Sequence, residues 1–242
     1  MNLQTNDMYR FFSLILLLLL QSLITSFIYK KLYDSWNIYI LILNFLTIFF
    51  LLSVHFRKGY VKINKKAVLS KRYCRVCKNY KPYRTHHCSS CNKCIKKMDH
   101  HCMWIGACVN YDNHGDFIRF LFFTFINTII NLILALIFIT VEYMTSLIVM
   151  MLAFTFTLNC ILFIIILCMG KIQINLINRN VTYIEDLNYF EFESEGVYDK
   201  GLWENWREVM GDFKWLWLGR PNGNGMNFLG DDLIENENIE IF

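Results

Sequence analysis

Four long apolar runs constrain this chain more than any other feature of its sequence. They span Phe11 to Tyr29, Trp36 to Val54, Phe117 to Val141, and Leu147 to Met169. At ~1.5 Å of rise per residue, about twenty residues cross the ~30 Å hydrocarbon core of a bilayer. One such run could be a buried core helix, but four of them in 242 residues, 55% hydrophobic, favour membrane spans. The sequence therefore predicts an all-α membrane protein with four transmembrane helices in two antiparallel hairpins.

A basic stretch separates the second run from the third. Between His55 and Asp116 the chain carries fourteen Lys and Arg residues and only three acidic residues. The positive-inside rule places such a loop in the cytosol, and with four spans both termini are then cytosolic as well. Lys30 and Lys31, in the short link between the first two runs, oppose this orientation weakly.

These assignments divide the chain into five parts. We expect a cytosolic N-terminus (1–10), a first transmembrane hairpin (11–54), a cytosolic cysteine-rich domain (55–116), a second hairpin (117–169) and a cytosolic C-terminal region (170–242). The expected location is a multi-pass integral protein of the endoplasmic reticulum, the Golgi or the plasma membrane.

The predicted loop holds a dense cluster of cysteine and histidine. Seven of the nine cysteines lie between positions 74 and 108. They are Cys74, Cys77, Cys88, Cys91, Cys94, Cys102 and Cys108, accompanied by His86, His87, His100 and His101. Paired Cys-x2-Cys spacing is typical of structural zinc sites. The cluster therefore indicates metal binding in a reducing compartment rather than a disulfide framework.

The number of potential ligands in this cluster suggests a second role. Structural zinc takes four Cys or His ligands, so two sites use eight. If six cysteines and two histidines supply them, one cysteine and two histidines remain. A free thiol beside a histidine and a carboxylate, as in Asp99-His100-His101-Cys102, suggests a nucleophile with its base and orienting group. A single zinc with spectator cysteines, or an extra ligand or inert packed thiol at Cys102, are the alternatives.

The order of these residues carries a family resemblance. The matching positions are Cys74-x2-Cys77, Lys81-Pro82-x-Arg84, His87-Cys88-x2-Cys91-x2-Cys94, Asp99-His100-His101-Cys102, Cys108, Asn113 and Phe117. This pattern resembles the DHHC family of zinc-containing integral-membrane protein S-acyltransferases (palmitoyltransferases). Thr182-Tyr183-Ile184-Glu185 resembles that family's Thr-Thr-x-Glu motif, and the segment around Asn205 its C-terminal Asn motif. Met103 replaces the common proline, and no Asp-Pro-Gly motif follows the second run.

The resemblance implies two interleaved structural zinc sites and one catalytic centre. The implied ligands are Cys74, Cys77, His87 and Cys94 for the first zinc, and Cys88, Cys91, His101 and Cys108 for the second. It implies that Cys102 is the nucleophile, that His100 is its base, and that Asp99 fixes the tautomer of His100 and stabilises its cationic form.

The resemblance also implies the substrates. A long-chain fatty acyl-CoA would acylate Cys102, and the acyl group would then pass to accessible cysteines of cytosolic or membrane-associated proteins. Trp104 and Phe117 would border the acyl slot, and Arg84 and Lys81 would bind the phosphates of CoA. Membrane lipids are further expected partners. The flanking spans argue against nucleic acid, although a basic zinc loop could bind it.

Two other functional classes fit parts of the sequence. A membrane zinc protein could act as an adaptor, but an adaptor has no use for the spare Cys102 beside Asp99 and His100. An inactive relative that only binds acyl lipid is disfavoured by the intact trio. Asn127 and Asn131, one helical turn apart in the third run, could line the acyl slot or join helices; the sequence favours neither.

Overall fold

The computed structural model describes residues 3–30, 34–62, 72–141, 145–187, 196–212, 219–221, 223–226 and 228. Part of the predicted basic loop and of the predicted C-terminal region lies outside these ranges.

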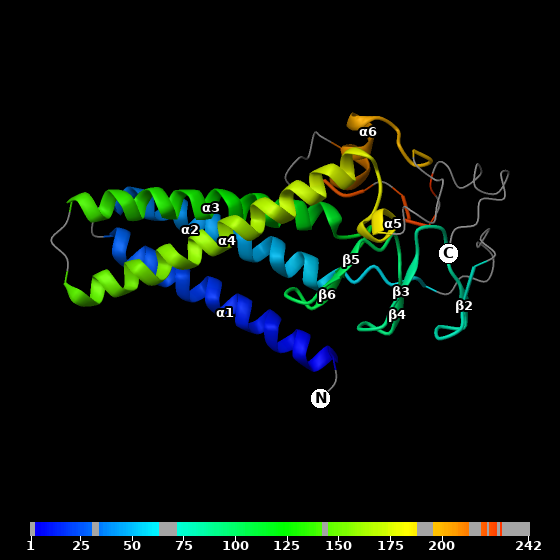
Figure 1. Ribbon diagram of the computed structural model, residues 1–242, viewed down its shortest axis with the longest axis horizontal. Helices are drawn as coiled ribbons and strands as arrows, with labels where there is room; N and C mark the ends of the chain where they lie inside the picture. Colours follow the sequence, from blue (N-terminus) through cyan, green and yellow to red (C-terminus); the bar gives the residue numbers. More distant parts are fainter. Residues whose placement is uncertain are drawn as a thin grey trace.

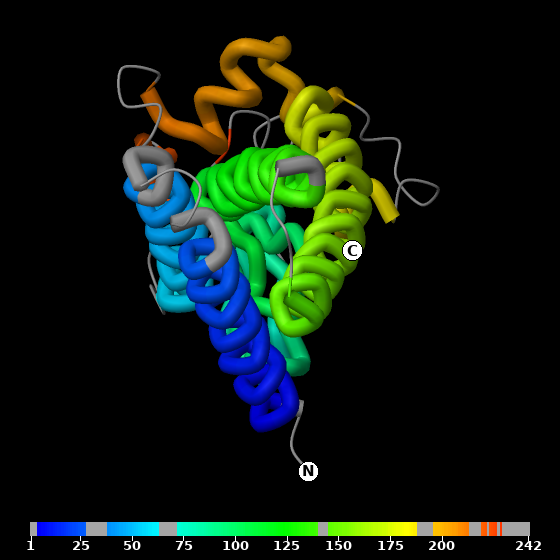
Figure 2. Tube along the Cα trace, turned by 90° about the vertical axis from the view of Figure 1, so that its left-hand side faces the viewer, coloured from blue at the N-terminus to red at the C-terminus, as the bar shows by residue number. Residues whose placement is uncertain are grey.

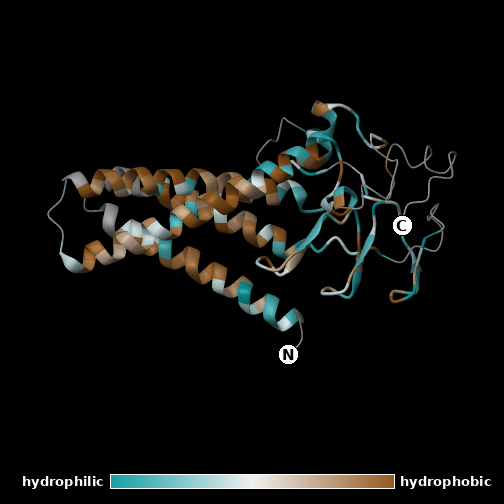
Figure 3. Ribbon diagram, in the orientation of Figure 1, coloured by the Kyte–Doolittle hydropathy of each residue, from teal (hydrophilic) through white to brown (hydrophobic). Residues whose placement is uncertain are grey.

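Four long helices form the bundle that the apolar runs predict. They are α1 (Leu3–Lys30), α2 (Asp34–Phe56), α3 (His114–Val141) and α4 (Ser146–Asn178). Each contains a stretch long and apolar enough to cross a membrane. They run along the long axis of the molecule, with the cysteine-rich domain at one end (Figure 1). Viewed along the bundle, α3 lies between α2 and α4, its main packing partners (Figure 2). Hydrophobic residues cover the bundle, and hydrophilic residues gather at the other end of the molecule (Figure 3).

Two of the helices extend beyond the predicted runs. Helix α1 begins at Leu3 rather than near Phe11, and α4 continues past Met169 to Asn178. Apolar periodicity marks only the part of a helix that faces lipid or core. The added turns are polar and carry Asp7 and Gln173 to the level of the cysteine-rich domain, where both side chains find partners.

The cysteine-rich domain consists of three short antiparallel hairpins, which the sequence analysis did not predict. Strands β1 (Tyr73–Cys74) and β2 (Asn79–Tyr80) form the first, β3 (His86–Cys88) and β4 (Lys93–Ile95) the second, and β5 (His100–Cys102) and β6 (Ala107–Val109) the third. In the second hairpin His87 lies opposite Cys94, and in the third His101 lies opposite Cys108. The pairing register thus sets a histidine and a cysteine from each predicted quartet side by side.

The C-terminal region packs back onto the bundle through two short helices, α5 (Tyr183–Leu187) and α6 (Leu202–Met210). Helix α6 contains Asn205, the residue of the C-terminal Asn motif. This asparagine is buried, and its amide group donates hydrogen bonds to the Asn178 carbonyl (2.8 Å) and to Asp199 (2.7 Å). Its side-chain oxygen accepts one from the Lys200 backbone N–H (2.9 Å). Asn205 therefore fixes the start of α6 on the end of α4.

Buried polar side chains connect the helices inside the bundle. The Asn127 amide donates to Asn44 of α2 (2.6 Å), and Asn131 donates to Asn127 (2.7 Å). Gln21 of α1 donates to Asn159 of α4 (2.8 Å). Hydrogen bonds between membrane helices contribute on average about 0.6 kcal/mol each. These contacts favour the helix-joining role for Asn127 and Asn131.

Candidate functional site

The structure brings the two predicted ligand quartets together as two separate clusters. One contains Cys74, Cys77, His87 and Cys94; the other contains Cys88, Cys91, His101 and Cys108. In each, the four potential ligand atoms lie within 4.8 Å of one another. The folding of the hairpins alone therefore reproduces the two groups of four.

The spacing of these atoms fits a tetrahedral zinc ion. The His87 Nδ1 atom lies 3.3 Å from the sulfur of Cys77, and the sulfurs of Cys91 and Cys108 are 3.6 Å apart. A zinc ion with ligands at about 2.0–2.3 Å gives tetrahedron edges of roughly 3.5–3.8 Å. A closed set of three cysteines and one histidine is also a standard structural zinc set. The donor atoms present therefore fit zinc at both clusters.

Backbone amides support the first sulfur of each knuckle. The Cys77 N–H points at the sulfur of Cys74, and the Cys91 N–H at that of Cys88, each at 3.4 Å. A donor aimed at sulfur stabilises the thiolate, the form that binds a metal.

Cys102 stands outside both clusters, although it follows His101 directly. It ends β5 and lies opposite Ala107 in β6. The preceding pair of this hairpin, His101 opposite Cys108, belongs to the second cluster. Its side chain packs against a buried apolar group that includes Ile105, Ala107 and Phe117. The thiol is thus held in a hairpin that the second cluster fixes from both strands.

Asp99 and His100 form an oriented pair beside this thiol. The His100 Nδ1 atom lies 2.7 Å from the Asp99 carboxylate. Asp99 is fully buried and also accepts hydrogen bonds from the Gln173 amide (2.9 Å) and from the Tyr183 backbone N–H (2.8 Å). These additional donors fix the carboxylate, and the carboxylate in turn fixes the imidazole ring.

The electrostatics of this trio favour a thiolate–imidazolium pair. Burial opposes ionisation of His100, but the hydrogen bond with Asp99 and the interaction with Cys102 outweigh it and raise the pKa of His100 to about 9. Burial likewise disfavours the Cys102 thiolate, yet its electrostatic interaction with His100 holds the pKa of the thiol below its ordinary value. Asp99 stays ionised despite burial, because its hydrogen bond with His100 keeps its pKa far below the usual range.

The Thr-x-x-Glu pattern from Thr182 to Glu185 starts the short helix α5 beside Asp99. The Thr182 N–H donates to the Glu185 carboxylate (2.8 Å), and the Glu185 N–H donates to the Thr182 hydroxyl (3.2 Å). This reciprocal pair is a capping box, which starts helix α5. Because Tyr183 is the first residue of that helix, the box also aims the Tyr183 N–H at Asp99.

Arg84 ties the same helix to the cysteine-rich domain. Its buried guanidinium donates to both carboxylate oxygens of Glu185, at 2.8 and 2.7 Å, and to the Asn180 carbonyl at 2.7 Å. It also lies 4.2 Å from the centre of the Tyr198 ring. The structure therefore places Arg84 in a network that orders the C-terminal region, while its contact with CoA remains a prediction.

The other predicted substrate contacts occupy different environments. Trp104 is exposed, and Lys81 is half-buried. Phe117 is buried at the start of α3, and its ring meets the His100 ring edge-on, with centroids 5.5 Å apart. Phe117 thus packs directly against the imidazole, and the acyl-binding roles of these residues stay predictions.

Sequence reasoning missed two groups near this site. Gln173 bridges Asp99 (2.9 Å) and His114 (2.6 Å), and Asp7 lies against His101 (2.9 Å). Each is a polar residue just beyond an apolar run, a position that a search for spans treats as the end of the helix. Extending each helix by a few turns would have placed both side chains at the level of the cysteine-rich domain.

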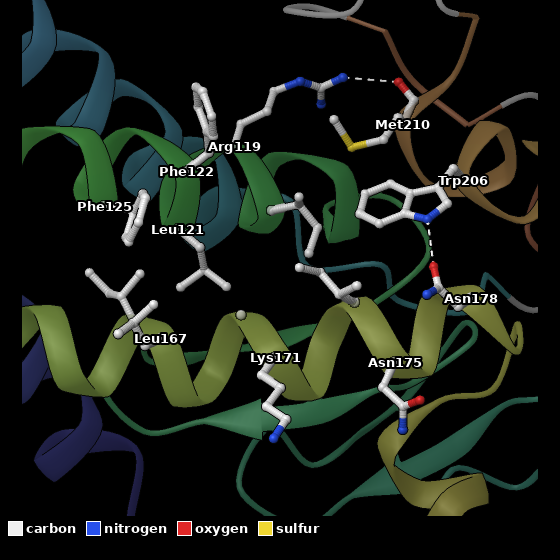
Figure 4. Close-up of a pocket in the computed structure, with 14 residues that line it drawn as sticks. Arg119, Leu121, Phe122, Phe125, Leu167, Lys171, Asn175, Asn178, Trp206 and Met210 are labelled. Atoms are coloured by element: carbon white, nitrogen blue, oxygen red, sulfur yellow. Dashed lines mark hydrogen bonds between the residues drawn. The ribbon is translucent and has the colours of Figure 1, made fainter. Parts of the chain in front are cut away.

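The structure also contains a large apolar pocket. It has a volume of about 750 Å³ and lies between α3 and α4, lined by residues such as Phe125 and Leu167. Figure 4 shows how α6 bounds it: Arg119 donates to the Met210 carbonyl (2.9 Å), and the Trp206 indole donates to Asn178 (2.8 Å). Its lining includes none of Asp99, His100 and Cys102, but Leu121 and Ile166 of the lining belong to the buried apolar group against which Cys102 packs.

The fold and site together define a four-helix membrane protein with paired metal clusters and a thiol–imidazole–carboxylate trio. The family model of the DHHC palmitoyltransferases matches residues 67–189, just over half of the 242 residues. The chain belongs to this family.

Three relatives illustrate the similarity. The chain is 36% identical over 154 residues to "Probable protein S-acyltransferase 12" of Arabidopsis thaliana, a match that covers 60% of this chain and 52% of the relative. It is 33% identical over 175 residues to "Palmitoyltransferase PFA3" of Debaryomyces hansenii (62% and 43%). It is 34% identical over 156 residues to "Palmitoyltransferase ZDHHC20" of Homo sapiens (61% and 42%). The matches span about half the length of these relatives.

Proposed function

We propose that this protein is a protein S-acyltransferase that moves a long-chain fatty acyl group from acyl-CoA to cysteines of other proteins. The acyl group travels through a thioester on Cys102. One observation carries the proposal: of the seven clustered cysteines, Cys102 alone lies outside both metal clusters, and its ionisation is coupled to that of His100, whose ring a buried carboxylate orients. The names of the relatives, which describe acyl and palmitoyl transfer, support the same chemistry.

The first half-reaction forms the acyl-enzyme. The Cys102 thiolate attacks the carbonyl carbon of the acyl-CoA thioester, a carbon–sulfur bond forms, and the bond to the CoA sulfur breaks. The departing CoA thiolate takes the proton held by the His100 imidazolium. Asp99 keeps that proton on the ring nitrogen facing the reaction by occupying the other nitrogen.

The second half-reaction runs the same chemistry in reverse. A cysteine thiol of the substrate protein gives its proton to neutral His100 and attacks the carbonyl carbon on Cys102. The Cys102 thiolate leaves, and the substrate carries the new thioester. One thioester replaces another in each step, so the reaction needs no ATP and no redox cofactor.

Two structural zinc ions would be held by the two Cys/His clusters. When bound, each supplies rigidity to a domain that has little regular secondary structure of its own. The hairpin of Cys102 would gain most, because His101 and Cys108 hold both of its strands.

The position of the site and the charge pattern support one orientation of the protein in the membrane. The site lies where the apolar bundle meets the basic domain, which suits a substrate that is half lipid and half polar. The excess of Lys and Arg between His55 and Asp116 supports a cytosolic location for this end of the bundle and for both termini. Trp104 and Phe117 would border the acyl chain, and Lys81 and Arg84 would attract the phosphates of CoA.

Covalent labelling tests the proposal. The purified protein is incubated with palmitoyl-CoA, and its intact mass and zinc content are measured. Wild-type protein gains one hydroxylamine-sensitive acyl group, whereas Cys102→Ser gains none and still holds two zinc ions. Cys168→Ser, which removes an exposed cysteine of α4 outside both clusters, serves as the matched control and labels normally. Labelling of Cys102→Ser would place the nucleophile elsewhere, and loss of zinc from it would make Cys102 a ligand.

A further inference from the structure

Asp7 is a buried carboxylate for which the proposed reaction gives no role. It lies near the start of α1 and is only 6% exposed. One of its oxygens lies 2.9 Å from His101 Nε2, and the other lies 3.2 Å from the Arg10 guanidinium. A buried carboxylate is costly unless it is paired and hydrogen-bonded. The pairing with His101 links the first helix of the bundle to a potential metal ligand 94 residues away in sequence.

The two nitrogens of His101 face different chemistry. Its Nδ1 atom lies 3.4 Å from the sulfur of Cys88, 3.5 Å from that of Cys91 and 3.4 Å from that of Cys108. Neutral imidazole carries one N–H, and a metal ligand must present a lone pair. If Nδ1 binds the metal, the proton must sit on Nε2, and Asp7 is the group that accepts a hydrogen bond from it.

The helix that carries Asp7 is held firmly against this part of the domain. Gly106, in the turn between β5 and β6, has a φ of +64°, and an added Cβ would lie 3.2 Å from the Asp7 carbonyl oxygen. The Phe11 ring stacks on the His55 ring at 3.8 Å, and His55 hydrogen-bonds to the Ile105 carbonyl at 2.6 Å. Asp7 therefore reaches His101 from a fixed backbone.

The first cluster provides a contrast within the same molecule. Within the part of the chain that the structure describes, no carboxylate pairs with His87, whose Nδ1 atom faces the sulfurs of Cys74 and Cys77 in the same way. Among the described residues, carboxylate support is therefore found at the second cluster, the one that holds the hairpin of Cys102, and not at the first.

We propose that Asp7 is a positioning residue for the second metal cluster. It orients His101, fixes its tautomer and strengthens it as a ligand, so that retention of the second metal ion depends on the first membrane helix. Carboxylate–histidine–metal arrangements act in this way, and loss of the outer carboxylate costs about 10–100-fold in metal affinity. The inference rests on metal occupancy as proposed above, and it is independent of the acyl-transfer chemistry.

Chelator competition on the full chain in detergent tests the inference. Wild-type protein, Asp7→Ala, Asp7→Asn and Asp7→Glu are loaded with zinc, and release is followed with a coloured zinc indicator. In Asp7→Ala, one of the two ions should leave at about 10–100-fold lower chelator concentration while the other behaves as in wild type. Asp7→Asn keeps the shape and an acceptor oxygen but loses the charge, and should give a smaller shift. Asp7→Glu restores the carboxylate and should recover part of the loss.

Arg10→Ala is the matched control. The Arg10 side chain is 44% exposed and is the other partner of Asp7. Its removal leaves the bond between Asp7 and His101 in place. Its release profile should match that of wild type. A cobalt-loaded form adds a spectroscopic readout, because the ligand-field bands of one site should shift in Asp7→Asn even when both sites are full.

The outcomes separate this inference from the proposed function. Unchanged release from both sites in Asp7→Ala and Asp7→Asn, or equal weakening of both, would overturn the role of Asp7. A wild-type protein that binds fewer than two zinc ions would overturn the metal assignment and this inference with it. Selective loss of one ion in a protein that never forms a thioester would support Asp7 and overturn acyl transfer.

Discussion

The ion pair between Arg84 and Glu185 should control both the stability of the C-terminal region and the reactivity of Cys102. The Arg84 side chain is 1% exposed and that of Glu185 is 21% exposed. Breaking a fully buried pair costs about 3–5 kcal/mol. Because Glu185 is partly open to solvent, and because glutamine keeps an acceptor for Thr182, we expect about 2–3 kcal/mol for Glu185→Gln.

Loss of the Arg84–Glu185 ion pair should lower the thermal unfolding midpoint and slow thioester formation on Cys102. For a chain of this size each kcal/mol shifts the midpoint by about 2–4 °C, so Glu185→Gln should lower it by roughly 4–12 °C. Helix α5 also aims the Tyr183 N–H at Asp99, so loosening the capping box should slow acylation of Cys102 at temperatures where the protein is still folded.

Glu204→Gln is the matched control for this prediction. Glu204 lies on α6, its side chain is 49% exposed, and its pair with Arg207 is 3.4 Å long. Exposed pairs contribute ~0–1 kcal/mol, so its midpoint and acylation rate should stay close to those of wild type. If Glu185→Gln behaves like Glu204→Gln in both assays, the structural role given to the capping box is wrong.

Two further predictions concern the thiol and the bundle. His100→Ala should raise the pKa of Cys102, because the burial that opposes its thiolate then acts without the compensating imidazolium. Iodoacetamide labelling of Cys102 at neutral pH should slow by about tenfold for each unit of that rise, and the gap should narrow as the pH increases; an unchanged pH profile would contradict the thiolate–imidazolium pair. Asn127→Leu should remove the bond to Asn44 and destabilise the bundle by about 0.6–1.7 kcal/mol, measured by unfolding in detergent. No change, or a gain in stability, would show that this bond does not hold α2 and α3 together.

The sequence predicts the parts of this molecule whose signals are local. Apolar runs reveal the four helices because each run is longer than any soluble core requires. The Cys-x2-Cys spacing reveals the metal clusters, and the resemblance assigns their members, including His87 and His101, to the quartets that the structure brings together.

The remaining contacts depend on where distant segments meet, which local patterns do not record. Asp7 and Gln173 lie in polar turns at the ends of membrane helices, and only the packing of the bundle brings them to His101 and Asp99. The sequence shows Arg84 only as one of many basic residues in the loop, whereas the fold buries it against Glu185. The hairpins are too short to show an alternating pattern, so their strands follow from the turns and clusters rather than from strand propensity.

Helix α4 runs without interruption from the far end of the bundle to Asn178, and it carries Gln173 against Asp99. Its apolar part, Leu147 to Met169, is about 35 Å long, a little more than the ~30 Å of a bilayer core, and polar turns continue beyond it. A hydrophobic stretch longer than the hydrocarbon core can adjust by tilting. The thickness of the surrounding membrane should therefore influence the geometry of the Asp99–His100 pair, because the tilt of α4 moves Gln173 relative to Asp99.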